Sequence, residues 1–220
     1  LEEPPPKYHF LLTAPASDLL LQTILSRCRI VRLGALTTEV VYAHLKARVD
    51  LPQDTLQTLA EFSEGALGRA MHWAQTLQSP ATDAKGNRER SELEALQGLM
   101  RVFERLGQAS LDEALCLAHD FREACKALEG GVEDRSTRAA LALGLEYLIQ
   151  WYRDSLALPH EGVSLRFASH KKEINELARR FGSVERAHDL QMITEARRAI
   201  LGNANAPIVT EHLFIQLLKM

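Results

Sequence analysis

The chain has 220 residues, of which 46% are hydrophobic and 25% are charged, and its formal net charge is -3. This composition is typical of a globular protein and not of a disordered chain. The small net charge gives no overall attraction to nucleic acid. Apolar runs are interrupted well short of the ~20 residues that span a membrane, and the first residues do not have the pattern of a signal peptide. We therefore expect a cytoplasmic protein without a membrane partner.

The chain begins with two apolar runs of strand length, Tyr8 to Thr13 and Cys28 to Leu33. Between them, Thr23-Ile-Leu-Ser-Arg-Cys28 predicts a short helix that leads into the second strand. An arginine at such a junction can project from the end of an element and reach the phosphates of a nucleotide, including one bound by a neighbouring subunit. The alternative is a surface arginine beside a buried cysteine, and six residues alone do not decide between them.

The residues around this stretch resemble a motif block of the clamp-loader ATPases. Leu1-Glu-Glu-Pro-Pro-Pro6, Phe10-Leu-Leu-Thr13 and Thr23-Ile-Leu-Ser-Arg-Cys28 follow one another in the family's order and at similar spacing. These ATPases belong to the AAA+ class and load the sliding clamp of DNA polymerase. The resemblance implies that Arg27, with Ser26 and Cys28 in the SRC motif, is an arginine finger for ATP bound by the adjacent subunit.

No Gly-x-x-x-x-Gly-Lys-Ser/Thr phosphate loop occurs in the sequence, and two strands do not make an independent sheet. The resemblance explains both observations if residues 1–36 are the C-terminal remnant of an AAA+ α/β core. The chain is then expected to be a C-terminal fragment that lacks the nucleotide-binding half, with no cofactor of its own.

Residues 37–78 predict three short helices. A threonine cap, Thr37 or Thr38, starts the first helix, Pro52 opens the second, and the third begins at Glu64. The resemblance assigns these helices to the family's three-helix lid, and an ordinary amphipathic helix is the alternative for the third.

Two positions that sense ATP in the family lack a suitable side chain here. Gly68 stands at the sensor-2 arginine, and Arg69 lies about 100° further round the helix, so it is a poor substitute. Ala14 or Pro15 stands at sensor 1, and neither side chain can donate a hydrogen bond. A finger without either sensor resembles the delta prime subunits of bacterial DNA polymerase III, which are the non-hydrolysing members of the loader.

A polar stretch, residues 79–92, predicts a linker, or a loop with a charged start to the next helix. Residues 93–220 predict helices throughout, and the capping box Ser110-Leu-Asp-Glu113 opens one of them. The resemblance assigns this part to a helical collar that forms the oligomer.

Within residues 93–220, a long helix follows Gly130-Gly131 and is apolar on nearly all sides between Ala139 and Tyr152. This pattern predicts a helix at the centre of a bundle. Gly182-Ser183 predicts a C′ glycine followed by an N-cap serine, and Asn203 to Pro207 predicts the cap of a last helix.

The most basic stretch contains six residues: Arg166, His170, Lys171, Lys172, Arg179 and Arg180. A helix face with Lys172 and Arg179 can form a stripe for DNA phosphates. The alternative is a solvated face balanced by Glu173 and Glu176.

The three cysteines and eight histidines show no metal-ligand spacing, so we predict no metal site. We expect buried thiols without a disulfide at Cys28, Cys116 and Cys125. The last two are nine residues apart, which places them on opposite faces of one helix.

These observations predict a mainly α protein with a two-stranded AAA+ remnant, a three-helix lid and a helical collar. We expect a subunit without catalytic activity of its own that completes the DNA polymerase III clamp-loader ring and supplies a finger during DNA replication. Its partners would be the gamma/tau and delta subunits, with the sliding clamp and primer-template DNA contacted indirectly. Two alternatives stay open: a fragment of an ATP-hydrolysing gamma/tau-like subunit, which Gly68 and Ala14-Pro15 disfavour, and a helical protein-interaction module without a link to nucleotide.

Overall fold

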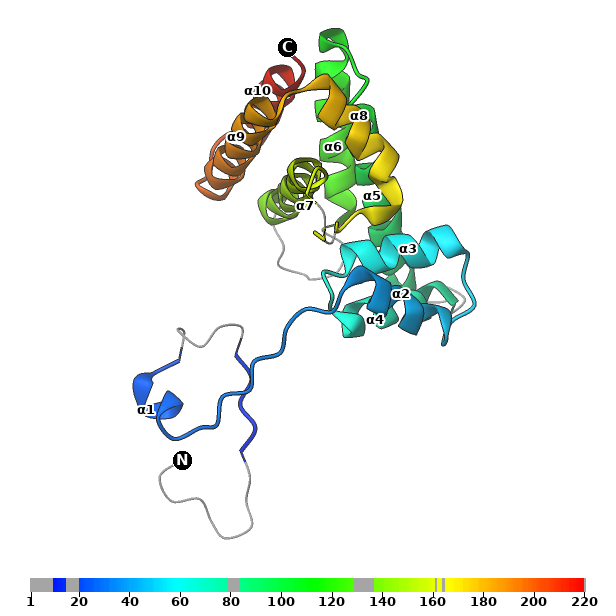
Figure 1. Cartoon of the computed structure of the whole chain (residues 1–220), viewed down its shortest axis with the longest axis vertical. Helices are drawn as coiled ribbons and strands as arrows, with labels where there is room; N and C mark the ends of the chain where they lie inside the picture. Colours follow the sequence, from blue (N-terminus) through cyan, green and yellow to red (C-terminus); the bar gives the residue numbers. More distant parts are fainter. Residues whose placement is uncertain are drawn as a thin grey trace. The chain divides into compact units, whose positions relative to one another are not determined.

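The computed structural model describes residues 10–14, 20–78, 84–128, 137–160, 162–163 and 165–219, with only the backbone for 84–93 and 127. The chain forms two compact units, Leu1–Ala35 and Leu36–Met220. Figure 1 shows the course of the chain through both, and each unit is described by itself. The prediction of a mainly α fold is confirmed, because regular structure in the described residues is helical throughout.

The described part of the first unit contains one helical turn, α1 (Gln22–Leu25), between stretches of irregular chain. The two predicted strands, Tyr8 to Thr13 and Cys28 to Leu33, are therefore wrong wherever the structure describes them. A strand needs a neighbour for its backbone hydrogen bonds, and the described residues supply none. The apolar side chains of these runs face solvent as a result, with Leu11 96% and Leu33 92% exposed.

The second unit begins with the three-helix segment, which consists of α2 (Thr38–Lys46), α3 (Gln53–Phe62) and α4 (Leu67–Gln78). The three predicted helices are confirmed, although α4 begins at Leu67 and not at Glu64. The reason is local: Glu64 and Gly65 both have positive φ, 58° and 73°, and this left-handed pair turns the chain after α3. The assignment of these helices to a lid stays a prediction.

The remaining helices form a bundle: α5 (Ala84–Arg105), α6 (Ala114–Ala127), α7 (Thr137–Ala157), α8 (Lys171–Arg180), α9 (Ser183–Leu201) and α10 (Ala206–Leu218). Helical backbone from Ala84 favours the charged helix start over the linker for residues 84–92, while 79–83 lie outside the described residues. None of the described helices is long and apolar enough to span a membrane.

Helix α7 is the central helix of the bundle, as its all-round apolar pattern predicts. It packs against α5, α6, α8 and α9, and Figure 1 shows it nearly end-on between α9 and α6. Leu145, Leu148, Trp151 and Tyr152 are fully buried there. The buried side chains from α2 to α10 form one continuous core, so the predicted division between residues 37–78 and 93–220 is not a break in packing.

The predicted caps are mostly confirmed. The Glu113 carboxylate accepts hydrogen bonds from the Ser110 amide at 3.0 Å and hydroxyl at 3.3 Å, which closes the capping box. The Asn205 side chain accepts from the Ile208 amide at 3.2 Å at the start of α10.

Gly182 is not the predicted C′ glycine. Its φ of -64° is not left-handed, and it is itself the N-cap of α9. The prediction of Ser183 as the N-cap is therefore also wrong, because Ser183 is the first residue of α9. The Glu185 carboxylate accepts the Gly182 amide hydrogen. Because the chain leaves α8 in extended conformation at Phe181, no left-handed residue is needed between α8 and α9.

The cysteines, all three of which the structure describes, are not joined by disulfides. The prediction of buried thiols holds for Cys125, whereas Cys116 is exposed and Cys28 is half-buried. Cys125 lies on the side of α6 that faces α7, where a Cβ on Gly144 would overlap its sulfur. Cys116 lies on another face of α6, as the nine-residue spacing predicts.

Candidate functional site

Arg27, the predicted arginine finger, lies on an exposed turn directly after α1. Ser26 caps this one-turn helix, and its hydroxyl donates a hydrogen bond to the Thr23 carbonyl at 3.2 Å. The Arg27 guanidinium donates to the same carbonyl, with 2.8 Å between Nη1 and the oxygen. A bond to a neutral carbonyl is weaker than the paired, charge-assisted bonds that a guanidinium forms with a phosphate. Arg27 can therefore exchange this local contact for a phosphate.

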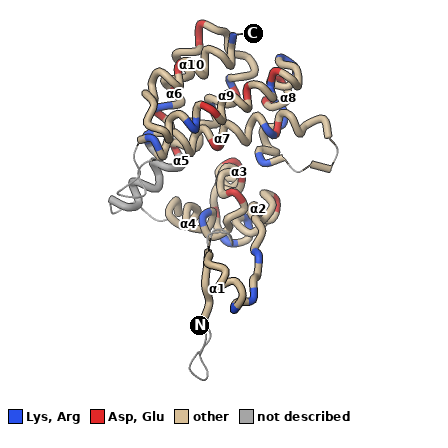
Figure 2. Tube along the Cα trace, turned by 90° about the vertical axis from the view of Figure 1, so that its left-hand side faces the viewer, with Lys and Arg blue, Asp and Glu red and all other residues tan. Residues whose placement is uncertain are grey.

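The chain around Arg27 is a basic segment. Residues 20–35 include Arg27, Arg29 and Arg32 but no Asp or Glu, and all three arginines are exposed. Figure 2 shows Lys and Arg without Asp or Glu along this segment, whereas both signs are mixed over the second unit. The segment therefore has a local positive charge that the net charge of the whole chain conceals, and it favours a phosphate-bearing partner.

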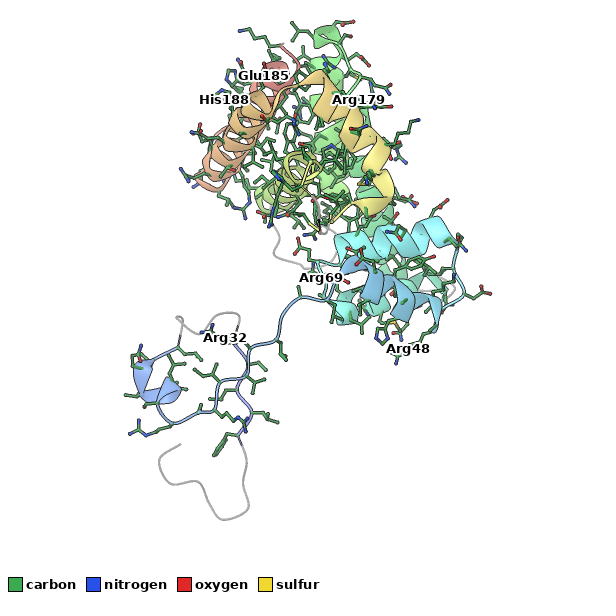
Figure 3. All side chains as sticks on the ribbon, in the orientation of Figure 1. Arg32, Arg48, Arg69, Arg179, Glu185 and His188 are labelled. Carbon is green, nitrogen blue, oxygen red and sulfur yellow. The ribbon has the colours of Figure 1, made fainter. Side chains whose placement is uncertain are left out.

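The two predicted sensor positions carry no hydrogen-bonding side chain in the part of the chain that the structure describes. Ala14 is exposed, and Pro15 lies outside the described residues. Gly68 is exposed near the start of α4, and a Cβ there would meet no described atom within 4 Å. Arg69, which Figure 3 labels, has its guanidinium 3.9 Å from the Glu64 carboxylate and 5.9 Å from the centre of the Trp73 ring.

Three of the six residues in the basic stretch bind to the protein itself: Arg166, His170 and Arg180. Arg180 donates to the carbonyl oxygens of Leu106 and Ala109 at the end of α5. The other three are exposed at α8: Lys171, Lys172 and Arg179, the last of which Figure 3 labels. Glu176 on the same helix pairs with Gln108 at 2.6 Å. Half of the basic stretch is thus engaged within the protein, and the choice between a DNA stripe and a solvated face for Lys171, Lys172 and Arg179 stays a prediction.

Glu61 on α3 was not singled out from the sequence. Its side chain is 1% exposed, and its Oε1 accepts hydrogen bonds from the Ser169 amide at 3.1 Å and hydroxyl at 2.6 Å. Its only sequence signal is its place beside the buried Ala60 and Phe62, because a carboxylate next to buried positions requires polar partners.

Asp189 on α9 is a second buried acid that the sequence pattern did not indicate. It is 1% exposed, and neither carboxylate oxygen has a hydrogen-bond partner among the described residues. Burial raises the pKa of Asp189 to about 6, with Glu185 adding to the effect and His188 opposing it. Burial, together with the nearby Asp189 carboxylate, also raises the pKa of Tyr152. The raised pKa of Asp189 predicts a contribution to stability that depends on pH.

A hollow of about 420 Å³ lies between α5 and α8 and is lined mainly by charged residues, among them Glu104, Arg105, Glu113 and Glu176. Arg105 pairs with Glu113 at 2.8 Å. The hydrogen bonds from the Ser110 amide and then from Arg105 hold the pKa of Glu113 below its usual value. No group of three or more His, Cys, Asp or Glu with metal-site geometry occurs in the described residues.

Comparison with known proteins gives two partial matches. A family profile described as "DNA polymerase III, delta subunit" matches residues 1–37, which include the exposed Arg27 turn. The match relates the first unit to the subunits of DNA polymerase III.

The second match is to DNA polymerase III subunit delta' of Haemophilus influenzae, which is 33% identical over 105 residues. The match covers 44% of this chain, and the chain spans 31% of the relative's length. Together the two matches support a relationship to DNA polymerase III subunits.

Proposed function

We propose that the chain is the C-terminal part of a delta prime-type subunit of the DNA polymerase III clamp loader. It completes the loader ring and supplies Arg27 as a finger to ATP bound by the adjacent subunit, without hydrolysing ATP itself. In this proposal α2–α4 are the lid, α5–α10 are the collar, and the gamma/tau and delta subunits are the partners. The sliding clamp and primer-template DNA are contacted through the complex.

The observation that carries this proposal is the exposed Arg27 turn inside the segment that matches DNA polymerase III subunits. Its guanidinium rests on a backbone carbonyl and stands in a segment without acidic residues. A guanidinium forms strong paired, charge-assisted bonds with a phosphate, so a phosphate from outside the chain is a suitable partner for Arg27.

The non-hydrolysing role rests on the two sensor positions. Gly68 leaves open surface where the family has an arginine, and Arg69 contacts Glu64 in the turn before α4 and Trp73 on α4. Ala14 has no donor group. These departures favour a delta prime-type subunit over an ATP-hydrolysing one.

The test is ATP hydrolysis, stimulated by clamp and primer-template DNA, in a loader reconstituted with the Arg27→Ala protein. An arginine finger contributes roughly 10³ to 10⁵ in rate in GTPases, and a ring with several ATP sites should lose less than this in bulk because one finger serves one site. Arg27→Lys should rescue little, because an ammonium does not form the planar fork.

Arg32→Ala is the matched control, because Arg32 is an exposed arginine of the same segment outside the SRC motif. Gel filtration should show intact rings for all three variants. If the assembled Arg27→Ala loader hydrolyses ATP and loads clamps at the wild-type rate, Arg27 is not the finger.

A further inference from the structure

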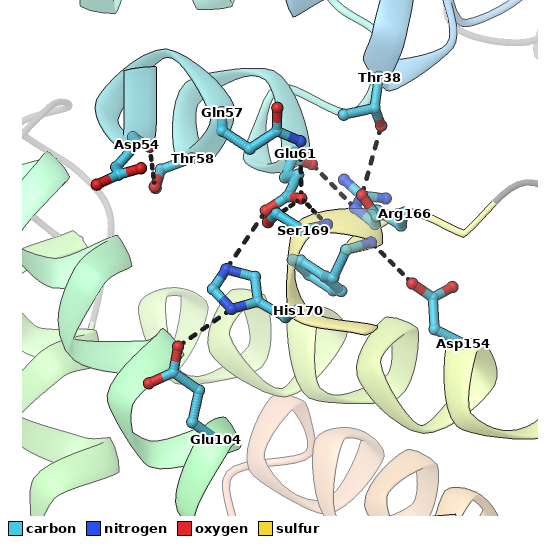
Figure 4. Close-up of polar contacts among 11 residues, drawn as sticks. Thr38, Asp54, Gln57, Thr58, Glu61, Glu104, Asp154, Arg166, Ser169 and His170 are labelled. Atoms are coloured by element: carbon cyan, nitrogen blue, oxygen red, sulfur yellow. Dashed lines mark hydrogen bonds and ion pairs between the residues drawn. The ribbon is translucent and has the colours of Figure 1, made fainter. Parts of the chain in front are cut away.

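Residues 165–170, the strap between α7 and α8, are held by polar bonds from two sides (Figure 4). On one side the Glu61 carboxylate of α3 accepts from the Ser169 amide and hydroxyl at 3.1 and 2.6 Å. On the other side the Asp154 carboxylate of α7 accepts from the Phe167 amide at 2.8 Å. The strap therefore joins the three-helix segment to the central helix of the bundle.

Two basic side chains of the strap, Arg166 and His170, extend this joint. Arg166 donates from Nε to the Glu61 carbonyl at 3.2 Å and pairs with Glu64 at 3.1 Å. His170 faces carboxylates from two helices, with Nε2 3.7 Å from Glu61 on α3 and Nδ1 3.1 Å from Glu104 on α5. The contacts to Glu61 and Glu64 are lost if α3 and the turn after it move away from the strap, and the contact to Glu104 is lost if the strap moves away from α5.

An aromatic side chain lies at the centre of the same joint. The Phe167 ring is fully buried, with its centre 5.5 Å from that of Phe62 on α3 and 5.6 Å from that of Trp151 on α7. Undocking of α3 would expose apolar surface where the Phe62 and Phe167 rings meet, so the polar bonds to Glu61 and this apolar contact break together.

The 3₁₀ turn that leads into α8 is bound to Glu61 as well. His170 precedes α8 as its N-cap, and its side chain makes no capping bond within the described residues. The amide of Ser169, one residue earlier in the 3₁₀ turn Ala168–His170, donates to the Glu61 carboxylate instead. The first amides of a helical turn need acceptors, and an acceptor for this 3₁₀ turn comes from a helix more than 100 residues earlier in the chain.

We propose that Glu61 and residues 165–170 form a latch that couples the docking of α2–α4 to the ordering of the start of α8. The two then form and break together, in one cooperative step. When the latch opens, the three-helix segment separates from the strap and the first turn of α8 frays with it, while α9 and α10 stay folded. The latch is a conformational device of the second unit and does not depend on the proposed role of Arg27.

The test is amide hydrogen exchange of the whole chain, compared between the wild type and Glu61→Gln, which keeps the shape and removes the charge. In Glu61→Gln, amides of α3 and of residues 165–172 should exchange about 10-fold faster or more, because bonds to a buried charge are lost. The factor should be the same in both segments. Amides in the middle of α9 and α10 should keep their wild-type rates. Ser169→Ala, which removes one donor and no charge, should show the same pattern with a smaller factor.

Glu195→Gln is the control, because Glu195 is exposed on α9 and bonds only Gln191 among the contacts described; all rates should stay as in the wild type. The proposal fails if Glu61→Gln accelerates α3 and leaves 165–172 protected, or if neither segment responds. It also fails if the rates in α9 and α10 rise by the same factor, because the whole unit then opens at once.

Discussion

The two units of this chain differ in what their apolar residues do. In the first unit, leucines at positions 11 and 33 are 96% and 92% exposed, and the described chain holds one helical turn. In the second unit, Leu145 and Leu148 are fully buried in a core that runs from α2 to α10. The unit with the strongest motif resemblance is thus the one with the least internal packing.

This difference follows from what each kind of residue needs. A guanidinium that reaches a phosphate must be exposed, so the motif around Arg27 requires no core of its own. A helix bundle is stabilised by apolar area removed from water, which many sequences achieve with similar residues. Motif strength therefore does not predict where the folding energy lies, and five substitutions test this difference between the units.

The largest effect is expected from Leu148→Ala in α7. This leucine is fully buried between helices, so its loss removes transfer free energy and leaves a cavity that costs about 2–5 kcal/mol of unfolding free energy. Urea unfolding followed by circular dichroism at 222 nm measures it. An effect below about 1 kcal/mol would mean that α7 is not the centre of the stable core.

Asp189→Asn should stabilise the second unit, and more so at higher pH. Because burial raises the pKa of Asp189 from 3.8 to about 6, the folded state holds the proton more tightly than the unfolded state. The contribution of Asp189 to the free energy of unfolding therefore falls as the pH rises from 3.8 to 6, and it stays low above that range. The cost of the charged form is roughly 3 kcal/mol at most.

The check is the melting temperature of the wild type and of Asp189→Asn at pH 4.5 and at pH 7.5. The advantage of Asn should be larger at pH 7.5. An equal difference at both values would show that Asp189 does not titrate in this range.

Two glycines give opposite predictions. Gly144→Ala places a Cβ against the Cys125 sulfur and 3.1 Å from the Phe121 ring, so overpacking between α7 and α6 should cost about 1–3 kcal/mol. Gly68→Ala meets no described atom within 4 Å on the exposed side of α4 and should stabilise by about 0.5–1 kcal/mol. Urea midpoints of the two variants should move in opposite directions, and a shift in the same direction contradicts the assigned faces of α4 and α7.

The smallest effect is expected from Leu33→Ala in the first unit, which matches Leu148→Ala in chemistry. With 92% of its surface exposed, this leucine loses almost no buried area, and the unfolding free energy of the chain should change by less than about 0.5 kcal/mol. The same urea experiment measures it. A loss of 2 kcal/mol or more, the range predicted for a buried leucine, would show that the first unit contributes to the core.

Local patterns in the sequence are enough to predict the helices of the second unit and to single out Arg27 in the first unit. Apolar spacing predicts α7 as a central helix, and capping residues such as Ser110 and Asn205 mark helix starts, because both signals lie within a few neighbouring residues. The Arg27 motif is local in the same way. The prediction of two strands was wrong because a strand depends on hydrogen-bonding partners elsewhere in the chain. An apolar run does not show whether those partners are present.

The tertiary structure alone decided the roles of the buried charges. Glu61 meets Ser169 and His170, and Asp189 lies near Tyr152, across long separations in the chain. Arg166, His170 and Arg180 belong to a basic stretch that suggested a partner, and packing instead turned them onto α3 and α5. A charge pattern in the sequence gives the sign of the charge on a side chain. The partner that stabilises this charge depends on which helices the core brings together.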